Sequence, residues 1–267
     1  MKGLGVIFAG GSANIAFQLG AAFALQKAGM GRIRGIAGAS FGVIAALLLA
    51  TEAVTKGRAA WLSLLCPQVR NLPPAKLQTI YQILQTSGLH RLPFEDFRER
   101  FGKGVYDKAD VEKFLASTID FHALGTPLLQ SLWLRATRFP EDVTVDFDLL
   151  HYAPEMRHIL FLTVTSLPLL NPAMHFGNGA VYWDGGLSPL VPLRPLYEEN
   201  GLRTFLIIHL TSQTRVHKED YPDARIYELI PPATMNDRVG VLDFRPAILQ
   251  ARFEAGKKQA EDVLKVL

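Results

Sequence analysis

The sequence has little cysteine and little net charge. Its one cysteine, Cys66, excludes an internal disulfide and any cysteine-rich metal site. A net charge of +3 over 267 residues gives no case for nucleic acid, although it would not oppose an anionic membrane surface. No metal is expected either, because no ligand spacing connects His90, His122, His151, His158 and His217.

A membrane or signal segment is also not expected. Residues 3–26 carry no formal charge, but five glycines and the polar Ser12, Asn14 and Gln18 make a poor membrane-spanning helix. The apolar run at residues 4–9 is too short for a signal peptide. We therefore expect a cytoplasmic protein, for which peripheral contact with a membrane stays open.

A Gly-x-Ser-x-Gly pentapeptide, residues 38–42, follows a short apolar run and precedes a helix-forming run at residues 43–50. Serine at the apex of a strand–turn–helix unit is typical of a nucleophile elbow. Gly38 and Gly42 lack a Cβ, which lets the chain reverse and lets the helix pack against the strand. Ser40 would then lie at a helix N-terminus, which favours developing negative charge. By itself, the pentapeptide could also be an ordinary turn.

Predicted strands alternate with predicted helices at both ends of the chain. Near the N-terminus, strands are expected at residues 4–9 and 33–37, and helices at residues 13–28 and 43–55. Towards the C-terminus, strands are expected at residues 159–164, 180–183, 204–210 and 225–230, and helices at residues 193–200 and 247–267. Repeated strand–turn–helix units predict an α/β fold with three α/β/α layers and a mostly parallel central sheet.

The middle of the chain, about residues 56–155, loses this alternation. Prolines interrupt it, and short amphipathic segments follow at residues 94–101 and 111–119. We expect a mainly helical cover over the sheet, so that residues 1–267 form a single domain. Whether this cover acts as a lid stays open.

Three glycine-containing turns each follow an apolar run: Gly10-Gly11, the turn around Ser40, and Asp184-Gly185-Gly186. In an open α/β sheet, turns at the carboxyl ends of strands converge on one crevice. A nucleophile, a carboxylate and backbone donors would then share one site, and acyl transfer requires these three parts. Each turn alone could be structural. No dinucleotide-binding or P-loop pattern follows the first strand, which argues against nucleotide binding.

Together these stretches resemble the patatin-like phospholipase family. That family has a glycine-rich oxyanion loop after the first strand, a Gly-x-Ser-x-Gly elbow in the second strand–helix unit, and an Asp-Gly-Gly much further along. The matching residues here are 10–12, 38–42 and 184–186, and residues 242–246 resemble the family's C-terminal part. The resemblance spans nearly the whole chain and implies a patatin-like fold.

The resemblance also implies a Ser–Asp dyad, with no metal or organic cofactor. Ser40 would attack an ester carbonyl and carry the acyl group, and Asp184 would accept the serine proton and later activate water. Gly185 and Gly186 would leave space for the close approach of the base loop. The oxyanion would be held by backbone N–H groups of Gly10, Gly11 and Ser12.

The first loop departs from the family pattern. The family usually has a third glycine, a basic residue and a further glycine where this chain has Ser12, Asn14 and Ile15. If the third position needs a positive φ, Ser12 is strained there. Losing the basic residue removes a charge that could polarise the loop or hold phosphate. We still expect hydrolysis of acyl esters, with phospholipid, lysophospholipid and neutral lipid esters as candidate substrates.

Two other functions stay open at this point. One is acyl transfer to or from CoA or an acyl carrier, which would rely on a histidine; His209 is the nearest candidate, although a structural role suits it better. The other is a non-catalytic lipid-binding protein whose altered loop has lost its oxyanion donors. The oligomeric state stays open as well.

Overall fold

The fold is taken from a computed structural model, which describes residues 3–10, 15–59, 117–124, 128–139, 141–165, 174–175, 180–185, 191–211, 216–232 and 246–267. The strands are β1 Leu4–Phe8, β2 Ile33–Ala39, β3 Ser131–Phe139, β4 Val143–Asp148, β5 Met174–His175, β6 Val181–Asp184, β7 Thr204–Ile208 and β8 Arg225–Leu229. The main helices are α1 Ile15–Ala28, α2 Gly42–Ala50, α7 Pro154–Val164, α8 Arg194–Glu198 and α9 Pro246–Leu264.

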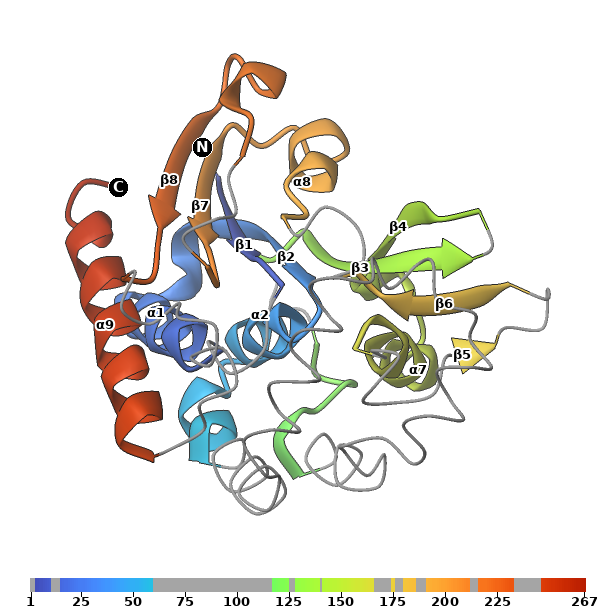
Figure 1. The fold of residues 1–267 in the computed structure, drawn as a ribbon, viewed down its shortest axis with the longest axis horizontal. Coiled ribbons are helices and arrows are strands. Elements are labelled where there is room, and N and C mark those ends of the chain that lie inside the picture. Colours follow the sequence, from blue (N-terminus) through green and yellow to red (C-terminus); the bar gives the residue numbers. More distant parts are fainter. Residues whose placement is uncertain are drawn as a thin grey trace, which may run out of the picture.

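The strands form one mixed sheet in the order β5-β6-β3-β2-β1-β7-β8, and β4 also pairs with β3. Five neighbouring strands are parallel to one another: β3, β2, β1, β7 and β8. By contrast, β4 and β6 run antiparallel to β3. Figure 1 shows β7 and β8 at one end of the sheet and β5 and β6 at the other. The predicted α/β sheet with mostly parallel strands is confirmed.

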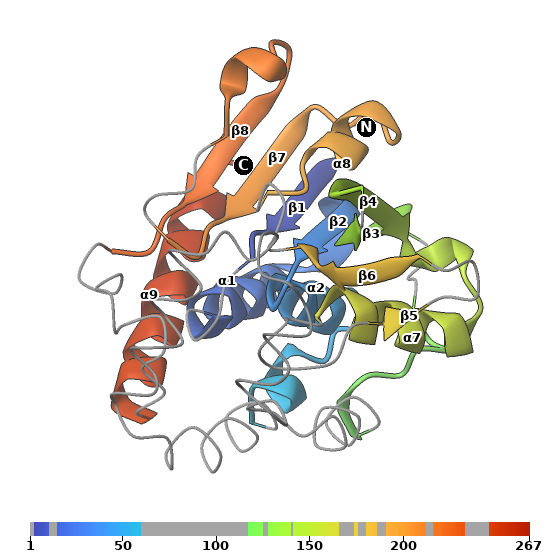
Figure 2. The same ribbon diagram turned by 45° about the vertical axis from the view of Figure 1, so that its right-hand side comes forward.

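Helices cover both faces of the sheet. In Figure 2, α1, α2, α7 and α9 lie on one side of the sheet and α8 lies on the other. The strands bury apolar residues in both directions: Val6 and Phe8 pack into the larger core, and Ile7 packs into the smaller core with Leu196 of α8. Burial on both faces explains why these strands read as continuous apolar runs in the sequence.

The last helix packs closely against the first. A Cβ added to Gly20 of α1 would lie 1.9 Å from the carbonyl oxygen of Phe253, and a Cβ added to Gly256 of α9 would lie 1.9 Å from that of Phe17. The two backbones therefore touch at both glycines. This contact joins the two ends of the described chain, as Figure 1 shows.

Two predictions about secondary structure were wrong. Residues 159–164 are the C-terminal half of α7 and not a strand, because Pro154 opens the helix five residues earlier. A short apolar run alone cannot distinguish a strand from a buried helix. The single helix predicted at residues 43–55 is interrupted. The helix α2 ends at Ala50, Glu52 adopts a φ of 54°, and a separate helical stretch follows at residues 54–59.

The predicted mainly helical cover, about residues 56–155, also contains strands. Residues 131–139 and 143–148 lie within it but form β3 and β4, which pair as a hairpin. The amphipathic segment at residues 94–101, and most of that at 111–119, fall outside the described residues. The nature of the cover between residues 60 and 116 therefore stays a prediction.

Candidate active site

Ser40 lies in a strained turn between β2 and α2. Its φ is 52°, in the left-handed region that non-glycine residues seldom occupy, and the residue is 4% exposed. The Val43 N–H donates to the Ser40 carbonyl oxygen at 3.0 Å, which closes the turn. Serine in this conformation between a strand and a helix has the local geometry of a nucleophile elbow.

The elbow glycines allow close approach of the backbone. A Cβ added to Gly42 would lie 2.5 Å from the carbonyl oxygen of Ala9, and one added to Gly38 would lie 2.9 Å from Cα of Val43. The first turn of α2 therefore sits directly against the end of β1. This close approach leaves no room for a side chain at Gly38 or Gly42.

One edge of β3 brings Ser40 and Asp184 together. Along this edge β2 pairs in parallel with residues 131–135, and β6 pairs antiparallel with residues 136–139. Ala39 lies opposite Arg135, and Asp184 lies opposite the next residue, Ala136. The carboxyl ends of β2 and β6 consequently meet end to end.

The two predicted catalytic side chains are in direct contact. The Ser40 hydroxyl donates a hydrogen bond to Oδ2 of Asp184 at 2.9 Å, and Asp184 is fully buried. The Thr137 hydroxyl of β3 donates to the Asp184 carbonyl oxygen at 3.3 Å. A Cβ added to Gly185 would lie 2.3 Å from the Arg135 carbonyl oxygen, so the base loop also lies against β3.

Arg135 supports this edge and was not identified from the sequence. Its side chain is almost fully buried, and it donates to both carboxylate oxygens of Asp146 on β4, at 2.8 and 2.7 Å. Such bidentate pairs are strong and directional. The alternation of apolar and polar residues along 131–139 was the available signal for this strand.

Of the predicted oxyanion loop, the structure describes Gly10. Gly10 follows the end of β1, where the Ala9 N–H donates to the Ile208 carbonyl oxygen at 3.1 Å. Gly11, Ser12 and, in the base loop, Gly186 lie outside the described residues. Ile15 begins α1 and is buried in the larger core.

His209 is buried and belongs to a separate polar cluster after β7. Its Nε2 lies 2.8 Å from Oε2 of Glu228, whose other oxygen lies 3.1 Å from the Lys218 ammonium group. Burial raises the pKa of Glu228, but hydrogen bonds from Lys218 and His209 outweigh it and hold that pKa below its ordinary value. Within the described part of the chain, the Ser40 hydroxyl bonds to a carboxylate and to no imidazole.

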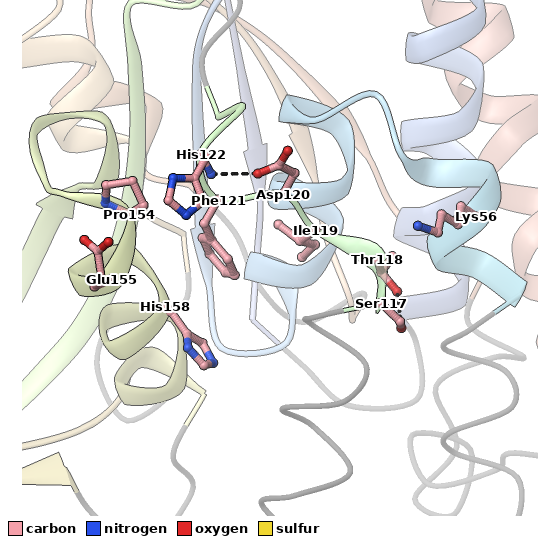
Figure 3. A pocket seen from close by; sticks show the side chains of 10 residues that line it. All are labelled: Lys56, Ser117, Thr118, Ile119, Asp120, Phe121, His122, Pro154, Glu155 and His158. Carbon is pink, nitrogen blue, oxygen red and sulfur yellow. Dashed lines mark hydrogen bonds between the residues drawn. The ribbon is translucent and has the colours of Figure 1, made fainter.

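A separate pocket of about 510 Å³ lies between α7, residues 117–122 and Lys56 (Figure 3). His122 and His158 are on its lining, and Nε2 of His158 is buried without a hydrogen-bond partner among the described residues. The described residues that line it include neither Ser40 nor Asp184. This pocket is therefore separate from the site formed by Ser40 and Asp184.

None of the described helices combines the length and the apolarity needed to cross a bilayer. Across the residues that the structure describes, no three His, Cys, Asp or Glu side chains group in a way suited to a metal ion.

The solved structures that this chain resembles include two bacterial proteins. VipD from Legionella pneumophila superposes with a TM-score of 0.52 at 12% identity, covering 99% of this chain and 67% of VipD. ExoU in its heterodimeric complex with SpcU, from Pseudomonas aeruginosa, gives a TM-score of 0.41 at 18% identity, covering 99% of this chain and 51% of ExoU. The chain thus spans about two thirds of VipD and about half of ExoU.

Sequence comparison identifies the family. No curated protein sequence matches the chain significantly. A family model described as patatin-like phospholipase matches residues 6–197, which is well over half of the sequence and includes both Ser40 and Asp184. The chain therefore belongs to the patatin-like phospholipase family.

Proposed function

We propose that the chain is a serine acyl hydrolase that cleaves acyl esters of lipids through a Ser40–Asp184 dyad. The observation that carries this proposal is the 2.9 Å hydrogen bond from the Ser40 hydroxyl to the buried Asp184 carboxylate. Family membership supports a lipid as the substrate. Ser40 has a strained φ and lies just before α2. Both features support a nucleophile close to the N-terminus of a helix.

In the acylation half-reaction, the Ser40 oxygen attacks the ester carbonyl carbon while Asp184 accepts the hydroxyl proton. The tetrahedral intermediate carries its negative charge on the former carbonyl oxygen, where backbone N–H groups of the loop that begins at Gly10 donate to it. The carbon–oxygen bond to the alcohol then breaks. Asp184 returns its proton to the departing alkoxide, which leaves as a neutral alcohol. The acyl group stays bonded to Ser40.

In the deacylation half-reaction, Asp184 removes a proton from water, and the resulting hydroxide attacks the acyl carbonyl. Breakage of the bond to Ser40 releases the carboxylic acid, and the serine regains its proton from Asp184. One ester and one water thus give one acid and one alcohol. An aspartate is a weak base, with an ordinary pKa of roughly 4. Direct contact between the two groups compensates in part, because proton transfer depends on geometry first.

The candidate substrates are phospholipid, lysophospholipid and neutral lipid esters. Because these molecules are held in membranes or other lipid assemblies, the proposal includes peripheral contact of the protein with a lipid surface. A net charge of +3 is compatible with such contact. The reaction needs neither a metal nor an organic cofactor.

Hydrolysis of p-nitrophenyl esters of several chain lengths tests the mechanism. We expect kcat to fall by about 10³-fold or more in both Ser40→Ala and Asp184→Asn, because each change removes one half of the dyad. Ser131→Ala and Asp148→Asn are matched controls, since they change a buried serine and a buried aspartate of β3 and β4 that bond elsewhere. Unchanged rates in Ser40→Ala and Asp184→Asn would remove the mechanism. Faster transfer to CoA than to water would replace hydrolysis by acyl transfer.

A further inference from the structure

Gln18 ties together the ends of two neighbouring parallel strands. It lies on α1 and is fully buried. Its side-chain Nε2 donates to the carbonyl oxygen of Ala9 at 2.7 Å and to that of Ile208 at 3.0 Å. Both amide hydrogens of Gln18 are therefore used at the point where β1 ends and the loop from Gly10 begins.

The bond to Ala9 also fixes the next peptide N–H. A peptide unit is planar and trans, so the Ala9 carbonyl and the Gly10 N–H lie in one plane and point in opposite directions. Rotation of the carbonyl would turn the N–H by the same angle. The Ala9 oxygen is further enclosed by α2, because the backbone of Gly42 leaves no room for a Cβ beside it.

The amide oxygen of Gln18 accepts no hydrogen bond from the described residues. This atom, Oε1, is buried. A buried acceptor without a partner destabilises a protein, and such atoms are rare in folded chains. An apolar side chain of similar shape would avoid that penalty. The fold therefore keeps an amide at this position for its two donors.

We propose that Gln18 is a positioning residue that sets the direction of the Gly10 N–H towards the oxyanion. This inference rests on the proposed function, in which that N–H stabilises the tetrahedral intermediate. Gln18 touches neither Ser40 nor the ester in this role, since it acts through the Ala9–Gly10 peptide unit. Its loss lowers transition-state stabilisation more than it lowers substrate binding.

Gln18→Met tests the inference, because methionine has a similar shape and no donors. With p-nitrophenyl butyrate we expect kcat to fall about 10- to 100-fold while KM changes less than about twofold. Removing a whole oxyanion donor costs about 10²- to 10³-fold, and misdirecting one costs part of that. Gln26→Met is the matched control: Gln26 is on the same helix and bonds to the backbone of Glu52 and Val54, away from the loop. We expect it to keep the wild-type kcat.

Gln18→Glu adds a readout that a purely structural role would not move. A neutral carboxyl group can donate one hydrogen bond to the Ala9 oxygen, whereas a carboxylate can donate none. The ratio of its kcat to that of the wild type should therefore rise as the pH falls and the introduced group takes up a proton. Thermal melts at each pH show the folded fraction, to which each kcat is corrected.

The outcomes separate this inference from the proposed function. A folded Gln18→Met protein with wild-type kcat would overturn the positioning role, even if Ser40→Ala and Asp184→Asn are inactive. So would a corrected kcat ratio for Gln18→Glu that does not change with pH, which also decides the matter if Gln18→Met fails to fold. Full activity in Ser40→Ala and Asp184→Asn would instead contradict the proposed function itself.

Discussion

The Ser40 hydroxyl and the Asp184 carboxylate are 2.9 Å apart because β2 and β6 end against consecutive residues of β3. The two side chains are 144 residues apart in the sequence. Their contact therefore depends on a third strand that carries neither of them. Changes that move β3 or the base loop should affect the reaction without touching the dyad.

The base loop provides the first prediction. A methyl group at Gly185 would lie 2.3 Å from the Arg135 carbonyl oxygen, so Gly185→Ala must move the loop and the neighbouring Asp184. We expect kcat for p-nitrophenyl esters to fall by about 10- to 100-fold, since small displacements of a catalytic group are costly. Gly31→Ala is the control, because a Cβ there meets nothing within 4 Å. Equal kcat values for the two variants would count against a fixed loop.

The strained turn at Ser40 predicts a difference in stability. Both Ser40→Ala and Ser40→Gly remove the hydroxyl and its bond to Asp184, but only glycine adopts a φ of 52° without strain. We expect Ser40→Gly to be more stable than Ser40→Ala by about 1 kcal/mol. Urea denaturation measures both free energies of unfolding. A more stable alanine variant would show that the turn is not strained.

The close contact between α1 and α9 predicts that a glycine-to-alanine change will destabilise the protein, which is the reverse of its usual effect in a helix. In a helix interior, replacing glycine with alanine ordinarily stabilises by about 0.5–1 kcal/mol. At Gly256 the added methyl group would lie 1.9 Å from the Phe17 carbonyl oxygen and force the helices apart. We expect Gly256→Ala to lower the free energy of unfolding by about 1–3 kcal/mol. A higher melting temperature for this variant would contradict the close contact.

Glu228 predicts a pH dependence of stability. Its pKa is below the ordinary value, so its contribution is present above the unfolded-state pKa and is lost as the pH falls through the folded-state pKa. Glu228→Gln should therefore be less stable than the wild type at pH 7, by about 1 kcal/mol, and the difference should shrink below about pH 4. Urea denaturation of both proteins at several pH values checks this. A difference that grows on acidification would reverse the assigned sign.

Much of the parallel part of the sheet could be predicted from the sequence, but β3 could not. The strands β1 and β7 are largely apolar, and β2 is apolar apart from Arg34, as expected for strands buried on both faces. In β3, the buried Arg135 is paired with Asp146 of β4, and that pairing is visible only in the folded chain. α7 was misread because its apolar half is as short as a strand.

The candidate site was partly predictable for a related reason. Ser40 and Asp184 follow apolar runs and match a family pattern, so both were predicted, and the structure places them in contact. Gln18 gave no such signal, because its two acceptors are backbone carbonyls and one of them is 190 residues away. Backbone partners depend on topology and leave no residue pattern in the sequence.

Covalent labelling of Ser40 tests the central claim most directly. A fluorophosphonate probe reacts with an activated serine, and peptide mass spectrometry identifies the modified residue. We predict one adduct on Ser40 in the wild type and labelling slowed by about 100-fold or more in Asp184→Asn, with Asp148→Asn labelled at the wild-type rate. Well-folded wild-type protein that is unmodified at Ser40, or an Asp184→Asn variant labelled as fast as the wild type, would contradict the dyad.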